Sequence, residues 1–248
     1  YSESTIRARV SAPLYLGENQ VLGLSASTRW SFPDFGGSAP ELWEDYQRTS
    51  LSLFSRTKFN DRWSLLLAPF VTFAGETDAD FEDSLTYSGI GGAYYQFSDD
   101  LSLGLGLGAF GQLEDDTVIV PLLLLDWTFA EDWRLTTAPT AGFPVQASVT
   151  LEYAPSETWT YALTARTGGN RFRLADDSPT SGGGVGEFDT SRIAAALTYE
   201  PREHFALTLH AGWTFAGQLE VLDDDGRSVF EEDRDGGPVL GFEAALRF

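Results

Sequence analysis

Polar and apolar residues alternate with a period of two along most of the chain. Between Phe205 and Phe215 the odd-numbered positions hold Phe, Leu, Leu, Ala, Trp and Phe, and the even-numbered positions hold Ala, Thr, His, Gly and Thr. Segments 49–59 and 159–165 alternate in the same way, and no stretch keeps the spacing of about 3.6 residues that marks an amphipathic helix. Neighbouring side chains of a strand point to opposite faces, so this pattern predicts an all-β protein whose strands each have one apolar face.

Six short polar turns join these segments in pairs. In each turn an apolar or aromatic residue is followed by a few turn-forming residues and then by a second apolar residue. The turns begin at Leu16, Phe59, Phe97, Phe129, Tyr153 and Tyr199. This repeat is typical of β-hairpins. The other connections are mostly longer and rich in acidic residues and glycine, as in 33–44, 75–83, 168–187 and 218–237. We therefore expect short turns at one end of the structure and long loops at the other.

Thirteen segments have the length of strands, and the whole chain, 1–248, is expected to form a single domain. The predicted strands are 5–16, 20–32, 46–59, 62–74, 84–97, 101–112, 118–129, 133–140, 145–153, 158–167, 191–199, 205–215 and 238–248. Bacterial single-chain barrels have an even number of strands. We therefore expect about 14 strands if one more precedes Tyr1, or about 12 if a segment lies outside the wall.

The C-terminal segment places Leu240, Phe242, Ala244, Leu246 and Phe248 on one face, and the sequence stops at this last aromatic residue. In this respect the chain resembles Gram-negative outer-membrane β-barrel proteins of the porin or channel kind, whose final strand typically ends in Phe and serves as the signal for the barrel-assembly machinery. The resemblance implies a transmembrane antiparallel up-and-down β-barrel in the cell outer membrane. It also implies contact with outer-membrane lipid and lipopolysaccharide, and assembly through the strand that ends at Phe248.

The length of the apolar runs and the positions of the aromatic residues fit a protein that crosses a membrane with strands. The longest apolar run, 118–125, is far shorter than the ~20 residues of a spanning helix, whereas a spanning strand needs only about 9 to 11 residues. Aromatic residues flank the short turns, as they do in the girdles of membrane barrels. In a soluble β-sandwich, which is the alternative, the same aromatic residues would form the core.

Charge is divided between the loops and one face of the strands. The chain has 37 acidic and 16 basic residues, a net charge of -21, which excludes a surface that neutralises nucleic-acid phosphates. It has no cysteine, hence no disulfide and no thiolate metal site. Most basic residues nevertheless fall on the polar, inward face, against only four inward acids, Asp126, Glu152, Glu200 and Glu243. The predicted pore-lining residues are Arg7, Arg9, Arg29, Arg48, Arg56, Lys58, Arg62, Arg134, Arg166, Arg192, His210 and Arg247.

These residues predict an outer-membrane channel that passes small solutes, because an arginine-rich lumen favours anions. One alternative is a closed structural barrel that presents its acidic loops to a protein partner. In that case the arginines would be paired and the inward Leu66, Phe70 and Val120 would pack against a plug. A second alternative is an envelope hydrolase using His210, but no pattern marks a nucleophile beside it. We expect neither enzymatic activity nor a cofactor.

One acidic loop imitates part of an EF-hand. Asp223, Asp225, Gly226 and Glu232 stand in the register of such a loop, but its first position is Val221, where a carboxylate is required. We therefore assign no metal site, and Asp223, Asp225 and Glu232 remain a calcium candidate.

Overall fold

The computed structural model describes residues 1–36, 41–137, 146–202 and 204–246, and this part of the chain is all β. Its strands are β1 (Ser2–Leu16), β2 (Gln20–Asp34), β3 (Tyr46–Lys58), β4 (Trp63–Glu76), β5 (Leu85–Ser98), β6 (Leu101–Gln112), β7 (Asp115–Ala130), β8 (Trp133–Thr136), β9 (Gln146–Tyr153), β10 (Trp159–Arg173), β11 (Val185–Arg202), β12 (Phe205–Thr214), β13 (Gly217–Leu222), β14 (Ser228–Arg234) and β15 (Gly237–Leu246). Among these residues no helix has the length and apolarity that crossing a membrane requires.

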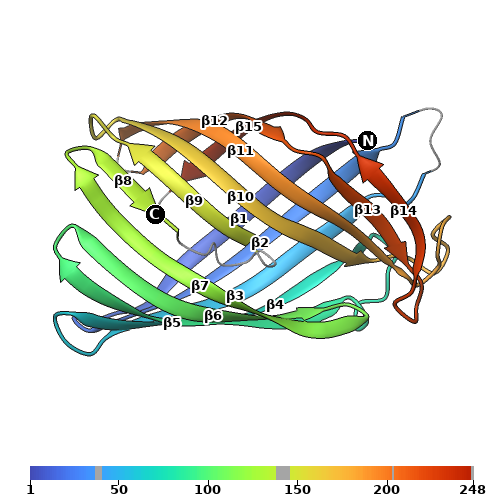
Figure 1. The fold of residues 1–248 in the computed structure, drawn as a ribbon, viewed down its shortest axis with the longest axis horizontal. Coiled ribbons are helices and arrows are strands. Elements are labelled where there is room, and N and C mark those ends of the chain that lie inside the picture. Colours follow the sequence, from blue (N-terminus) through green and yellow to red (C-terminus); the bar gives the residue numbers. More distant parts are fainter. Residues whose placement is uncertain (37–40, 138–145, 203, 247–248) are drawn as a thin grey trace.

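The strands follow one another around an elongated β-barrel (Figure 1). From β1 to β12, and then to β15, each strand pairs antiparallel with its neighbour, and the β13–β14 hairpin is attached to β11. A parallel contact between Gly75 of β4 and Arg173 of β10 closes a circuit of seven strands, β4 to β10, and leaves the remaining strands outside it. A regular up-and-down barrel of 14 strands is therefore not what the structure shows. Within the described residues, no hydrogen-bonded pair joins β1 to β15.

The sequence prediction missed two features at the long-loop end. Segment 218–237, predicted as a loop, contains the β13–β14 hairpin, because Leu219 and Val221 alternate with polar residues and are buried. Segment 168–187, also predicted as a loop, instead extends β10 to Arg173 and begins β11 at Val185. These segments are rich in glycine and acidic residues, and their short stretches of alternating apolar and polar residues were therefore not recognised as strands. The short turns, by contrast, lie where they were predicted.

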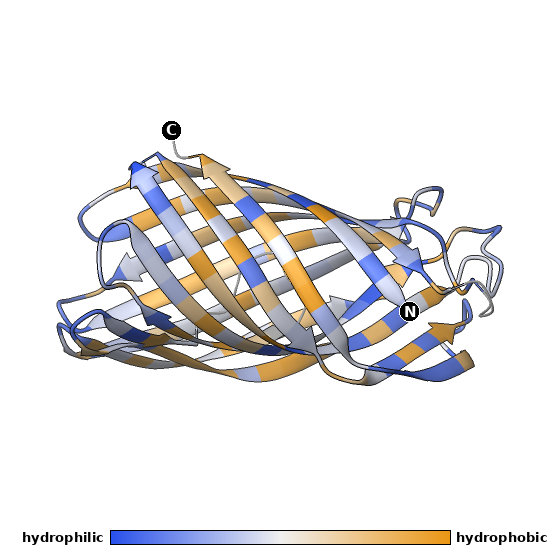
Figure 2. Ribbon diagram, turned by 90° about the horizontal axis from the view of Figure 1, so that it is seen from above, coloured by the Kyte–Doolittle hydropathy of each residue, from blue (hydrophilic) through white to orange (hydrophobic). Residues whose placement is uncertain are grey.

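The outer face of the barrel is apolar. The exposed fractions of the side chains reach 73% for Leu105, 72% for Tyr87 and 83% for Leu240, although all three lie within strands. Apolar residues alternate with polar ones along the strands (Figure 2). Across β6 and β7, Leu105 lies directly opposite Leu123, so exposed apolar residues of neighbouring strands adjoin. A soluble monomer rarely exposes a continuous apolar surface of this kind.

One part of the interior wall is also apolar, but it packs against itself. The buried side chains come from β4, β5 and β6 and are joined by partly buried residues of β5 and β7. They are Leu66, Ala68, Phe70, Ile90 and Phe110, with Tyr94, Val120 and Leu122. Leu124 is fully buried beside Gly92, where a Cβ atom would lie 2.6 Å from Cδ1 of Leu124. These wall side chains thus bury one another at the place where the closed-barrel alternative predicts a plug.

Candidate functional site

Arginine side chains meet inside the barrel from two groups of strands. On one side Arg7 of β1 lies directly opposite Arg29 of β2, which in turn lies opposite Arg48 of β3. On the other side Arg166 of β10 lies opposite Arg192 of β11. Like charges at directly opposed positions destabilise a sheet. The strands therefore carry two unfavourable ladders of positive charge, here called the arginine cluster: Arg7, Arg29, Arg48, Arg166 and Arg192.

Hydrogen bonds across the interior bring the two ladders together. Nη2 of Arg29 donates to Oδ1 of Asn170 on β10 at 2.5 Å, and Nη2 of Arg48 donates to the carbonyl oxygen of Arg171 at 2.7 Å. Arg166 is close enough to be repelled by Arg29, and Arg192 is repelled by both. The tertiary fold thus joins two ladders that lie more than a hundred residues apart in the sequence.

Several donors of this cluster lack a partner. The Nε atoms of Arg29, Arg48 and Arg192 are buried and form no hydrogen bond, and the Arg48 side chain is only 6% exposed. A nearby carboxylate, Glu3, accepts hydrogen bonds from the hydroxyl groups of Tyr1 at 2.9 Å and Tyr46 at 3.1 Å. Burial, reinforced by the Glu3 charge, raises the pKa of Tyr1 above its usual range, so its hydroxyl remains a donor. Buried donors without acceptors are costly and mark a site that an anion would satisfy.

An aromatic cluster fills the long-loop end of the barrel. This mouth cluster consists of Leu42, Trp43, Tyr46, Ala74, Phe172, Leu174, Phe188, Leu219 and Val221. The ring of Phe172 stacks on Tyr46 with centroids 4.0 Å apart and planes at 5°, and Trp43 meets it edge-on at 5.3 Å. Phe172 is fully buried, although the segment that contains it was predicted as a loop. The arginine cluster is therefore separated from the long-loop end by packed side chains.

Buried charges hold the loops over this cluster. The carboxylate of Glu76, at the end of β4, accepts hydrogen bonds from the backbone N–H groups of Glu44 at 2.5 Å and Ala175 at 2.6 Å. The guanidinium group of Arg173 donates to the carbonyl oxygens of Asp83 and Gly183 and pairs with Glu114. These contacts join connections that are distant in the sequence, so the mouth is braced as well as packed.

The short-turn end contains a cavity of about 560 Å³. Its lining includes Asp132, Glu152, Glu200 and Glu243, with Arg134 as the basic residue. Arg134 donates from Nε and Nη2 to the two carboxylate oxygens of Asp126, both at 2.7 Å, and its Nη1 lies 3.8 Å from Glu152. This short-turn cavity is thus acidic, and the interior is positive at the arginine cluster rather than along its whole length.

The other predicted pore-lining residues occupy varied positions. Arg9 lines a smaller cavity beside β1 to β3, and Arg56 lies over the ring of Tyr94, 5.3 Å from its centroid. Lys58 is exposed at the end of β3. Arg62 lies in the next turn and donates to the hydroxyl of Tyr95 at 2.9 Å, beside the exposed Trp63.

The remaining predicted residues are His210, Arg247 and the C-terminal Phe248. Nε2 of His210 lies 3.9 Å from Glu243. The structure therefore places a carboxylate beside the imidazole, but shows no hydrogen bond from it to a nucleophile within the described residues. Arg247, together with Phe248, falls outside the described residues.

Comparisons with known proteins place the chain in a family. A family model described as "Domain of unknown function (DUF6268)" matches residues 37–248. The chain belongs to this DUF6268 family. A search of curated proteins found no match. Among solved structures, a mutant of the ferric enterobactin receptor from Pseudomonas aeruginosa is similar with 12% identity and a TM-score of 0.28. The alignment covers 99% of this chain and 46% of the receptor chain, so the chain spans about half of the receptor's length.

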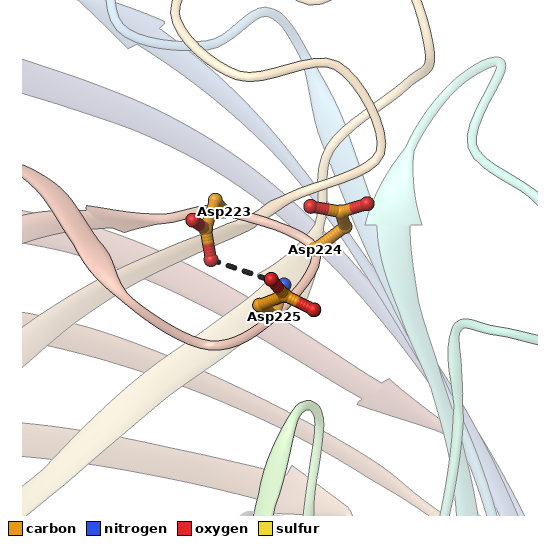
Figure 3. A group of neighbouring side chains, drawn as sticks. All are labelled: Asp223, Asp224 and Asp225. Carbon is orange, nitrogen blue, oxygen red and sulfur yellow. Dashed lines mark hydrogen bonds between the residues drawn. The ribbon is translucent and has the colours of Figure 1, made fainter.

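The calcium candidate of this DUF6268 chain is only partly assembled. The carboxylates of Asp223, Asp224 and Asp225 lie within 4.8 Å of one another at the tip of the β13–β14 hairpin (Figure 3). Oδ1 of Asp223 accepts hydrogen bonds from the backbone N–H groups of Asp225 at 3.0 Å and Arg227 at 2.8 Å. Glu232 lies opposite Leu219 in the hairpin, away from the tip. The aspartates therefore form a turn that its own backbone and Arg227 stabilise, and not an EF-hand.

Sequence reasoning missed three basic residues of the DUF6268 barrel. Arg171 and Arg173 were assigned to a loop, whereas the structure places them at the end of β10. Nη2 of Arg171 pairs with Glu187 at 2.6 Å. Arg234, in the segment predicted as the last loop, lies 5.9 Å from the ring centroids of both Tyr1 and Phe188. The available signal was the alternation Arg171-Phe-Arg173, which continues the period of β10.

Proposed function

We propose that this chain is an outer-membrane β-barrel. The outer face supports the proposal, because membrane barrels need an apolar band toward the lipid and hydrogen-bonded strands throughout. Outer-membrane lipid and lipopolysaccharide would contact this face, and the barrel-assembly machinery would recognise the strand that ends at Phe248. Closure would occur between β1 and β15, whose residues Arg7 and Glu243 are close enough to attract each other. These strands run in the same direction, so their pairing would be parallel.

We further propose that the barrel passes small solutes and favours anions. The observation that carries this proposal is the arginine cluster, whose buried Nε atoms on Arg29, Arg48 and Arg192 have no acceptor. Positive groups within a narrow low-dielectric interior raise the local concentration of anions. The mouth cluster occupies the long-loop end, so solutes would have to pass its packed side chains. We therefore expect a small conductance for the wild-type protein.

Reconstitution into planar bilayers tests the channel. Under a gradient of potassium chloride, the proposal predicts discrete current steps and a reversal potential displaced toward the chloride equilibrium potential. Replacing Arg29 and Arg192 with glutamine would reduce this displacement, whereas replacing Arg227, on an exposed turn, would not. Steps with cation selectivity, or a protein that inserts without conducting, would contradict the channel.

A closed docking barrel is the second candidate, and the mouth cluster favours it. Packed aromatic rings and the Glu76 hydrogen bonds close the long-loop end, and the acidic connections there offer a negative surface. This protein would insert into bilayers without conducting and would bind a basic protein partner in a salt-dependent manner. Conductance steps from the folded protein would exclude a fully closed barrel.

A further inference from the structure

We infer that the arginine cluster is a binding site for a small oxyanion with the geometry of phosphate or sulfate. The inference deepens the proposed function, since it rests on an interior that anions enter. It starts from three buried Nε–H groups without an acceptor, on Arg29 of β2, Arg48 of β3 and Arg192 of β11. Because these strands belong to the two opposing ladders, the free donors come from both sides of the interior.

Two carboxylates lie near the edges of this cluster, where Glu243 attracts Arg7 and Glu3 attracts Arg192. The carboxylate of Glu3 is engaged by the hydroxyl groups of Tyr1 and Tyr46. The partners that Arg29 and Arg48 do have, Oδ1 of Asn170 and the carbonyl oxygen of Arg171, are both uncharged. Neutral acceptors orient a guanidinium group without cancelling its charge. Arg29 and Arg48 are thus positioned by the fold through uncharged acceptors, and this combination favours a bound anion beside them.

The type of donor selects the type of anion. A guanidinium group is planar and presents a fork of N–H donors that matches two oxygen atoms of phosphate, sulfate or carboxylate. Several such groups on facing strands match a tetrahedral oxyanion with two charges better than a halide, which has one charge and no preferred directions. Lysine would supply the charge without the fork. The five members of the cluster are all arginine, so the donor geometry supports oxyanion binding beyond simple charge attraction.

We expect an anion to enter from the side of the short-turn cavity. The mouth cluster packs the other end, whereas the cavity of about 560 Å³ lies at the short-turn end and is lined by residues outside the arginine cluster. Its carboxylates, including Glu152 and Glu243, would slow the entry of a doubly charged anion without occupying the arginines. We therefore expect binding that is selective in equilibrium and slow to establish at low ionic strength.

A thermal unfolding assay on the detergent-folded, full-length chain tests the site. Sodium phosphate or sodium sulfate is compared with sodium chloride at equal ionic strength, and the unfolding temperature is read from the band shift between boiled and unboiled samples on SDS gels. Phosphate and sulfate are expected to raise the wild-type unfolding temperature above its value in chloride. The double variant Arg29→Gln, Arg192→Gln is expected to lose this increment. Arg227→Gln, at the exposed hairpin tip, is the matched control and should retain it.

A lysine substitution separates oxyanion geometry from charge. Arg192→Lys preserves the charge, so we expect anion selectivity in bilayers to persist while the phosphate affinity falls by about tenfold or more, as loss of a charged bidentate contact predicts. If the double glutamine variant fails to fold, this variant alone decides the question. An equal stabilisation of wild type and Arg192→Lys by phosphate would overturn the inference.

The outcomes for the site and for the channel are distinct. Anion-selective current without any stabilisation by phosphate or sulfate beyond that of chloride would overturn the oxyanion site and leave the channel in place. Stabilisation that depends on Arg29 and Arg192, in a protein that conducts nothing, would refute the channel and support the site. Stabilisation by phosphate that persists in the double variant would place the bound anion elsewhere and overturn the inference.

Discussion

The packing of Phe172 against Gly186 allows a sharp test of the mouth cluster. The two residues lie opposite each other on β10 and β11, and the Phe172 ring covers the glycine. A Cβ atom on Gly186 would lie 2.6 Å from Cζ and 2.9 Å from Cε2 of that ring. The ring has little room to withdraw, because Tyr46 stacks on it at 4.0 Å and Trp43 meets it edge-on at 5.3 Å. An alanine at position 186 must therefore displace a packed aromatic pair.

The expected magnitudes follow from this geometry. Phe172→Ala removes a fully buried ring, so we expect the free energy of unfolding to fall by about 3–5 kcal/mol. Gly186→Ala overpacks the same place and should cost about 1–3 kcal/mol. In the Phe172→Ala background the space above Gly186 is empty, so the glycine substitution should cost almost nothing. The double-mutant cycle should thus give a coupling energy of about 1–3 kcal/mol.

Urea unfolding of the refolded barrel, followed by tryptophan fluorescence, measures these energies. Phe81→Ala serves as the matched control, because Phe81 lies in the connection between β4 and β5, is 62% exposed and, among the described residues, stacks on Phe73 alone at 5.3 Å. Its cost should stay within about 1 kcal/mol. Bilayer recordings test the function as well. We expect Phe172→Ala to widen the long-loop end and to increase the conductance. Additive costs for the two substitutions at positions 172 and 186 would refute the packing argument.

Three further predictions concern other parts of the barrel. Glu76→Ala leaves two backbone N–H groups, one of them on Ala175, without their acceptor. We therefore expect the free energy of unfolding to fall by about 2–4 kcal/mol and the hydrogen exchange of those amides to become faster. Unchanged exchange would contradict the role of Glu76 in holding the loops together. Leu105→Arg places a charge on the outer face and should destabilise the protein in lipid vesicles by about 2–4 kcal/mol. A variant that folds into vesicles as readily as the wild type would argue against a lipid-facing position for Leu105. Glu152→Gln removes one charge from the short-turn cavity and should increase anion selectivity, which a reversal potential identical to that of wild type would disprove.

Local sequence patterns were sufficient for much of the fold. The alternation around Phe205 to Phe215 identified β12 and its apolar face, and the turns that begin at Phe59 and Phe97 were located correctly. These features depend on residues close together in the chain, so they can be read without knowing the tertiary structure. The β13–β14 hairpin was missed because acidic residues masked the two buried positions, Leu219 and Val221, that reveal it.

The charge pairing of the inward arginines could not be predicted from the sequence. Alternation identified Arg29, Arg48, Arg166 and Arg192 as inward residues, and the structure brings them into one cluster. The sequence left open whether they would be paired, because pairing depends on which strands face each other across the interior. In the structure Arg134 has a carboxylate partner, Asp126, on the neighbouring strand, whereas within the described residues the hydrogen bonds of Arg29 and Arg48 across the barrel go to uncharged acceptors.

The amino-acid sequence by itself therefore determined that the chain is all β, where most strands and short turns lie, and that several arginines share the polar face of their strands. Only the tertiary structure decided that one end is filled by an aromatic cluster, that the other end is acidic, and that the positive charge is concentrated between them. The physical reason is that strand periodicity is local, since it depends on successive side chains pointing to opposite faces. Charge compensation and closure of the mouth arise from contacts between strands far apart in sequence, such as Arg29 with Asn170, which no local pattern encodes.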